Sequence, residues 1–409
     1  MWFRLSWLVF VAIFLAPSLF AQEDSTEKDG NTANPPGLIF TLATKSGQKV
    51  FHLGEIIEIE ERYSSDVPRK YYVLAQPSKV EGGFSTKLAI LPKNSVIDRL
   101  QNTGRVSAEP ILIAKCMGYG ISGGATGVCT DCDGRWVLGR EPLRFPYSLN
   151  YRFTITEPGR YLFTARAGNI ALSDAPSKEE KAMEVTSNSL ELEVVRDEGW
   201  SSEQLRLAVA KFDAARRNYL LERWDERPES GDHPEEFVRR TETGKAMNDA
   251  AQVIRFLDTE ESLGQAVRLY DGSANLASYE NPFWRAILES SHRKLAVKLL
   301  ADRMLKEDFL VSQDFLDVLT AMTIQQEQPE TFERGDESSR KQLSFRAREI
   351  QKSYVLSLGK NLASKDGKAR EVGIKTFEHY AGQSYCAGEP LIEENLAQQI
   401  LKHAQGANP

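Results

Sequence analysis

Three of the four cysteines lie in one glycine-rich segment, Lys115 to Leu143. Cys129 and Cys132 form a C-x-x-C pair, which could supply two ligands of a zinc site with Cys116 as a third. A closed structural zinc site needs four ligands, and the segment has no second C-x-x-C pair or H-x-x-x-H motif. The sequence therefore favours disulfides over a metal, and we predict no metal ligand and no cofactor.

Four cysteines allow three disulfide connectivities. A single bridge from Cys116 to either Cys129 or Cys132 is favoured. Cys386 then either pairs with this segment or carries a free or intermolecular thiol. Binding residues often lie on disulfide-linked loops of this kind. The alternative is a surface loop whose disulfide serves only stability. The candidate binding residues of the loop are Tyr119, Ser122, Asp131, Asp133 and Trp136.

The same segment matches two catalytic or cofactor motifs whose structural context fails. Residues 118–123 satisfy G-x-G-x-x-G, but a dinucleotide site needs a helix next and Thr126-Gly127-Val128-Cys129 cannot form one. Residues 120–124 satisfy G-x-S-x-G around Ser122, but a nucleophile elbow requires a parallel α/β sheet, and this half shows no α/β alternation. We expect neither a dinucleotide site nor a serine nucleophile.

A calcium loop is excluded by charge. Asp131-x-Asp133-Gly134 matches the middle of an EF-hand loop, but Cys129 would be its first ligand and Arg140 its twelfth. The five histidines, His52, His233, His292, His379 and His403, have no partner at metal or triad spacing. We therefore predict no catalytic residue.

The chain that must position these side chains is 409 residues long, a length that fits two domains. With 41% hydrophobic and 27% charged residues, it can bury a core. Its net charge of −7 disfavours a uniform nucleic-acid-binding surface, so we predict no nucleic-acid partner.

The N-terminus has the pattern of a secretory signal peptide over residues 1–21, with Arg4, an apolar stretch and Pro17. We expect cleavage after Ala21, and an uncleaved anchor is the alternative. Residues 22–36 lack apolar side chains to bury and should be a disordered linker. No later stretch has transmembrane length, so the mature chain should have no integral membrane segment and should function outside the cytoplasm, secreted or periplasmic.

Residues 37–197 show short alternating stretches separated by turns, which predicts an all-β domain. Leu38–Leu42 and Lys49–Leu53 flank a turn and should form a hairpin or a sequential pair of strands. Residues 51–59, F-H-L-G-E-I-I-E-I, resemble the opening of immunoglobulin-like domains of secreted bacterial proteins. Pro158-Gly159-Arg160-Tyr161 resembles their tyrosine corner. The resemblance implies an immunoglobulin-like sandwich in which the Tyr161 hydroxyl bonds to upstream backbone, with 115–143 as a Cys/Gly-rich insertion.

Residues 200–405 change to helical periodicity. Ser201 is the expected N-cap of the first helix, with Gln204 completing a capping box and Trp200 packing between the two halves. Very short links predict helical hairpins, and residues 254–262 and 284–294 resemble the corners of HEAT-like repeats. The predicted fold is thus an all-β sandwich followed by an all-α, solenoid-like domain, with a globular helical bundle as the alternative.

These expectations favour a secreted, non-catalytic interaction or scaffold protein. Its partner would be a protein or a glycan, bound through the sandwich loops, the helical stack or both. One alternative is a periplasmic or extracellular hydrolase with its site at the seam between the domains. Another is an assembly factor anchored in the cell envelope.

Overall fold

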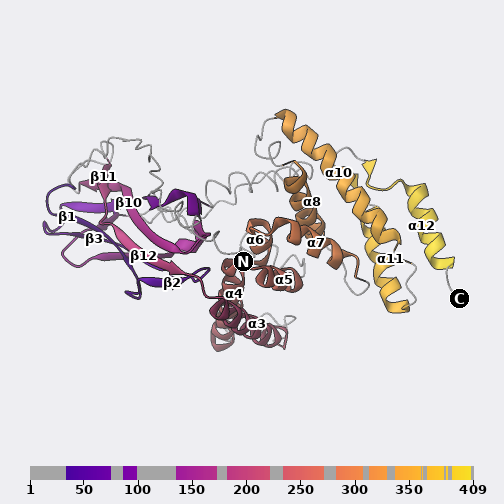
Figure 1. The fold of residues 1–409 in the computed structure, drawn as a ribbon, viewed down its shortest axis with the longest axis horizontal. Coiled ribbons are helices and arrows are strands. Elements are labelled where there is room, and N and C mark those ends of the chain that lie inside the picture. The colour runs from indigo at the N-terminus through magenta and orange to yellow at the C-terminus, as the bar shows by residue number, and fades with distance from the viewer. Residues whose placement is uncertain are drawn as a thin grey trace, which may run out of the picture.

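The computed structural model describes residues 34–74, 86–98, 135–172, 182–221, 234–270, 282–306, 313–328, 337–360, 362, 366–381, 384–385 and 389–406. A strand-rich N-terminal half is followed by a helical C-terminal half, which confirms the predicted order. Figure 1 places the strands at one end of the molecule, with the helices following toward the other end, where α12 lies. None of the helices in the described ranges is long and apolar enough to cross a membrane.

The strands of the N-terminal half form two principal sheets. The smaller sheet has the order β1-β3-β8, and all its pairs are antiparallel. The larger follows β2-β12-β10-β4-β7, with β5 and β11 also paired to β10. The strands of these sheets are β1 (Leu38–Thr44), β2 (Val50–His52), β3 (Glu58–Ser65), β4 (Tyr71–Leu74), β5 (Thr86–Leu91), β7 (Arg135–Val137), β8 (Leu143–Ser148), β10 (Gly159–Leu172), β11 (Met183–Thr186) and β12 (Leu190–Val195). A separate pair joins β6 (Val96–Asp98) to β9 (Phe153–Ile155).

The long strand β10 organises the larger sheet, because it pairs in turn with β12, β5, β11 and β4. Strand β2 lies parallel to β12 and not beside β1. Of the two predicted arrangements, the hairpin is therefore wrong, because β1 pairs with β3 in the other sheet; the two stretches are sequential strands that do not pair with each other. Local turn chemistry at Ser46-Gly47 reverses the chain but does not choose the partner, which is set by long-range packing.

One buried cluster takes side chains from both sheets, because apolar residues alternate along the strands. In β12, Leu190, Leu192 and Val194 are buried while the intervening glutamates are exposed. Phe40 of β1 stacks on Tyr63 of β3, with ring centroids 4.4 Å apart. Each such fully buried side chain contributes about 1.5–3 kcal/mol relative to exposure.

Asparagine side chains join segments of this half by mimicking a peptide group. Asn188 accepts from the Leu42 N–H at 2.8 Å and donates to the Leu42 carbonyl at 3.2 Å. Asn34 makes the same double contact with Thr186. Asn150 accepts from Ile57 and donates to the Glu55 carbonyl, which fixes the segment between β2 and β3. Buried backbone groups that have no strand partner are satisfied in this way.

The C-terminal half contains nine α-helices within the described residues. Their bounds are α3 (Glu198–Leu221), α4 (Pro234–Leu257), α5 (Glu260–Leu269), α6 (Pro282–Glu289), α7 (Arg293–Met304), α8 (Gln313–Glu327), α10 (Glu337–Lys360), α11 (Gly367–Ala381) and α12 (Glu394–Gly406). The short strands β13 (Ser384–Tyr385) and β14 (Glu389–Pro390) pair between α11 and α12. Each helix packs chiefly against helices close to it in the chain.

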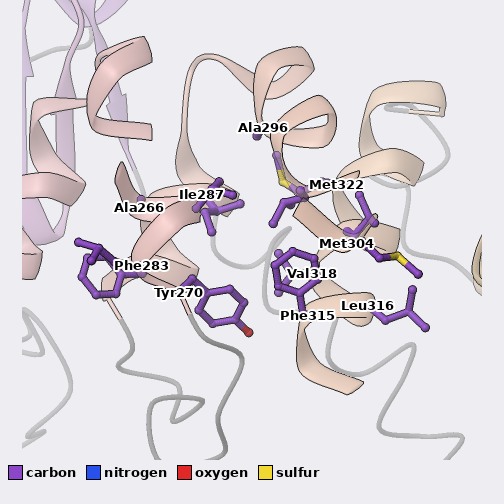
Figure 2. Close-up of a cluster of buried hydrophobic side chains, with 14 of the residues drawn as sticks. Ala266, Tyr270, Phe283, Ile287, Ala296, Met304, Phe315, Leu316, Val318 and Met322 are labelled. Carbon is purple, nitrogen blue, oxygen red and sulfur yellow. The ribbon is translucent and has the colours of Figure 1, made fainter. Parts of the chain in front are cut away.

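One large buried apolar cluster runs through the helical half, and a smaller separate cluster packs α8 against α10. Figure 2 shows the middle part of the large cluster, where Phe283 and Ile287 of α6 lie near Ala266 of α5, and Phe315 of α8 lies beside Tyr270. The Tyr270 and Phe315 rings are 5.9 Å apart and nearly parallel. Because this core is continuous, neighbouring helices support one another.

Helix α3 begins earlier than the sequence predicts. It starts at Glu198, and the Asp197 carboxylate accepts from the Trp200 backbone N–H at 2.9 Å. Asp197 therefore occupies the N-cap position expected for Ser201, whose hydroxyl donates to the Asp197 carbonyl at 3.1 Å. Asp and Ser are similarly favoured at N-caps, so residue preference alone could not choose between them.

Candidate binding groove between the two halves

Aromatic stacking joins the two halves where the chain passes from β12 to α3. His52 of β2 stacks on Trp200 of α3, with ring centroids 4.4 Å apart and planes 8° apart. The Glu55 carboxylate lies 3.1 Å from His52 Nδ1 and accepts a hydrogen bond from the His52 backbone N–H at 2.8 Å. Trp200 also packs against the helical core. The ring thus lies between the halves, in contact with both.

A close backbone approach makes a second contact. Gly54 has a φ of +84°, and a Cβ placed on it would lie 2.8 Å from Leu257 Cα and 2.9 Å from the Phe256 carbonyl oxygen. Only glycine fits both the left-handed backbone and this distance. The turn after β2 therefore rests directly on the C-terminal end of α4.

Arg255 supplies the third contact and is almost fully buried. Its guanidinium donates twice to the Glu289 carboxylate of α6, both at 3.0 Å, and once to the Gln252 side-chain oxygen at 3.1 Å. It also lies 5.7 Å from the ring centre of Tyr151, in the β half. The Tyr151 ring meets Phe256 edge-on at 5.5 Å. The Arg255 guanidinium, paired with Glu289 and close to the Tyr151 ring, therefore holds the C-terminal end of α4 against the β half.

An open groove of about 750 Å³ lies beside these contacts, within the size range of ligand sites. One wall comes from β3, β8 and adjoining residues of the β half, and the other from one face each of α3 and α4. The residues lining it are Ile56, Glu58, Tyr147, Ser148 and Tyr151 from the β half, and Gln204, Leu207, Ala208, Lys211, Lys245, Asp249, Ala250, Gln252, Val253 and Phe256 from the helices.

The charges of the groove are unevenly neutralised. Glu58 forms an ion pair of 2.9 Å with Lys45, whose pKa is raised by that bond. Lys211 and Lys245 are exposed and form no ion pair with the described residues. Gln252 is buried, and its side-chain oxygen is held by Arg255. Among the described residues its amide nitrogen has no hydrogen-bond partner. The groove therefore presents two ammonium groups, an amide donor and one further carboxylate, that of Asp249, which is exposed and forms no ion pair with a described residue.

A buried carboxyl group lies between the two sheets and is separate from the groove. Glu61 is only 1% exposed and accepts from Tyr63 Oη at 2.8 Å, Tyr147 Oη at 3.1 Å and Thr86 Oγ1 at 3.2 Å. Burial raises the pKa of Glu61, and the hydroxyl donors and the nearby Arg152 oppose that rise. Burial raises the pKa of both tyrosines, so their hydroxyls keep their protons and donate. Such shielding makes the cluster a structural element of the core.

Serine, histidine and aspartate side chains also meet at one helical corner, but not in a catalytic order. Ser290 Oγ donates to Asp258 Oδ1 at 2.9 Å and accepts from the His292 backbone N–H at 3.1 Å. His292 Nε2 lies 3.1 Å from the Asp258 carbonyl oxygen. A triad needs the imidazole on the hydroxyl, and here the imidazole is bound to the backbone. The described residues also hold no group of three metal-binding side chains.

The residues predicted from the cysteine segment lie mostly outside the described residues. This holds for all four cysteines, Cys116, Cys129, Cys132 and Cys386, and for Tyr119, Ser122, Asp131 and Asp133. Trp136 lies in strand β7, is 46% exposed and has its ring 5.4 Å from that of Phe145. Tyr161 is buried, and its hydroxyl donates to the Glu157 carbonyl at 2.6 Å.

Sequence reasoning did not select the residues that line the groove. On α3, Gln204, Leu207 and Lys211 have the three- and four-residue spacing of one helix face, so that signal was present. On α4, Lys245 and Gln252 lie on a similar face. Lysines at such spacing are common on solvated helices, and only the apposition of the two halves distinguishes these.

A scan of family models, a search of curated proteins and a search of solved structures each found no match to this chain.

Proposed function

We propose that this protein is an exported, non-catalytic binding protein that holds its partner in the groove between its two halves. The observation that supports this most is the groove itself, about 750 Å³ with walls from both halves. Its walls are fixed by the Trp200–His52 stack and by the close contact at Gly54. A site with fixed walls avoids the entropy cost of ordering loops when a partner binds.

For the architecture we propose an immunoglobulin-like sandwich followed by a solenoid of helical hairpins. The shared core of the two sheets and the Tyr161–Glu157 bond support the sandwich. The packing of each helix chiefly against its chain neighbours supports the solenoid. Export follows from the signal-peptide pattern of residues 1–21.

The residues that line the groove favour a binding protein over a hydrolase with its active site between the two domains. The carboxylates of the groove are Glu58, which is paired with Lys45, and Asp249. The lining residues include neither histidine nor cysteine. The buried carboxyl of Glu61, whose pKa is raised, is shielded from the groove by its hydroxyl donors.

Site-specific photo-cross-linking tests this proposal. The mature chain carries a photoreactive amino acid at Leu207, in the groove, or at Leu396, an exposed position on α12, and is irradiated in the producing cells. We expect one defined adduct from position 207 and none from 396. Equal adducts at both positions would contradict a groove-bound partner. Turnover of a hydrolase substrate that is lost in both Glu58→Gln and Asp249→Asn would favour the hydrolase instead.

A further inference from the structure

We infer that the partner is a peptide segment of a protein, with an apolar anchor residue and a nearby carboxylate side chain. This inference rests on the proposed function, since it concerns the same groove. The contacts of the tyrosines in the groove wall distinguish a peptide partner from a glycan partner.

Sugars are commonly bound through the open face of an aromatic ring. Tyr151 carries the Arg255 guanidinium 5.7 Å from its ring centre and the Phe256 ring edge-on. Tyr147 is committed through its hydroxyl to Glu61, at 3.1 Å. Both tyrosines of the groove are thus engaged in internal contacts, and Phe256, the third aromatic lining residue, is buried. The lining therefore favours a peptide over a glycan.

The end of the groove nearest the seam offers apolar surface instead. Leu207 is 46% exposed, and Ile56 and Val253 are half-buried in the opposing walls. A single exposed leucine is ordinary on a protein surface. Here it lies in a concave site with apolar neighbours from both halves, which can bury an aliphatic or aromatic side chain.

The other end of the groove is basic. Lys211 lies about three helical turns beyond Trp200 along α3, and Lys245 lies about three turns before Phe256 along α4. Both ammonium groups are therefore away from the seam, about one to two turns past the apolar surface. Neither ammonium group is paired with a described residue, so a carboxylate of the partner could form an ion pair with them.

Between the two ends, the amide nitrogen of Gln252 can donate to a peptide carbonyl. Its orientation is fixed, because Arg255 holds the side-chain oxygen at 3.1 Å. An extended peptide advances about 3.3 Å per residue, so the acidic residue should follow or precede the anchor by about two to four residues. Asp249 disfavours a second acid beside it, which limits the acidic stretch.

The experiment selects binders from a random dodecapeptide library on the mature chain. The selected peptides are then synthesised and measured against the double variant Lys211→Glu/Lys245→Glu, which plays no part in the selection. We expect the selected peptides to combine an apolar residue with Asp or Glu at the stated spacing. A synthesised peptide should bind at least ten-fold more weakly to that double variant and to Leu207→Asp. Affinity should be unchanged in Lys352→Glu/Lys402→Glu, which makes the same charge change at exposed positions on α10 and α12.

The outcomes separate this inference from the proposed function. Selected peptides without acidic residues, or peptides whose binding survives both lysine substitutions, would overturn the inference. Binding of uronate oligosaccharides on a glycan array that the double variant abolishes, with no peptide selected, would also overturn it but leave the groove as the binding site. If the groove variants bind peptides and glycans as well as the parent does, both this inference and the proposed function are overturned.

Discussion

At the residue scale, Glu61 shows how a polar side chain can belong to a core. It follows Ile59 by two positions and precedes Tyr63 by two, so the alternation of β3 puts it on the inner face. Three hydroxyl groups satisfy its oxygens there. The alternation of β3 indicated this position, but two of the three partners, Thr86 and Tyr147, come from β5 and β8 and could be found only in three dimensions.

The raised pKa of Glu61 gives a prediction about pH. A carboxyl group with a raised folded pKa contributes stability that is present below its ordinary pKa of 4.5 and is lost as pH rises through the folded value. Glu61→Gln keeps the shape and cannot ionise. We expect the free energy of unfolding of the variant to rise relative to that of the parent as the pH increases above 4.5, because only the parent loses the stability that its protonated Glu61 provides.

Urea unfolding of both proteins at several pH values measures this difference. The groups around Glu61 are Tyr63, Tyr147, Thr86 and Arg152, none of which is expected to change charge over this range. Stability curves for parent and variant that stay parallel across the range would show that Glu61 ionises normally.

At the scale of elements, Asp258 connects two helical corners. It links α4 to α5 with a φ of +44°, and its carboxylate accepts from Ser290 Oγ and the Ser291 N–H, before α7. Burial raises the pKa of this carboxyl group, against the effect of those bonds. One residue thus completes two turns at once.

Substitutions of Asp258 test how much its left-handed backbone and its side-chain hydrogen bonds contribute to stability. Asparagine tolerates the left-handed backbone and keeps an acceptor for Ser290, whereas alanine loses both. We expect Asp258→Ala to lower the free energy of unfolding by about 2–4 kcal/mol and Asp258→Asn by about 1 kcal/mol or less. Thermal and urea denaturation followed by circular dichroism gives both values. An alanine variant as stable as the asparagine variant would refute this role.

Several elements were predictable because their signal is local. The alternation Leu190, Leu192, Val194 predicted β12 and its inner face, and the Pro-Gly-x-Tyr turn predicted the bond of Tyr161. The partner of β2 was missed, since parallel pairing with β12 depends on residues at the far end of the β half. The groove was missed for the same reason: its walls come from segments that only the folded chain brings together.

At the scale of the whole molecule, the contact between the halves depends on Gly54. We expect Gly54→Ala to cost more stability than Gly47→Ala, although both glycines have a positive φ, +84° and +76°. The strain of alanine is shared by the two variants, at about 1–2 kcal/mol. Only at position 54 does the new methyl group meet another segment, Leu257 and Phe256 of α4, which adds about 1–3 kcal/mol.

Small-angle X-ray scattering provides the second measurement for this pair. The radius of gyration should increase in Gly54→Ala, as the halves separate, and stay at the parent value in Gly47→Ala. Equal stability losses with unchanged scattering in both variants would mean that the turn after β2 yields without disturbing α4.

The parallel pairing of β2 with β12 also sets the order in which the chain can fold as it is made. Strand β2 is synthesised early and cannot pair until β12, the last strand of the larger sheet, has been synthesised. Helices α3 onward find their partners within the next helix or two. The larger sheet therefore remains incomplete until the β half has been synthesised to its end, whereas the helical half can acquire structure as it is produced.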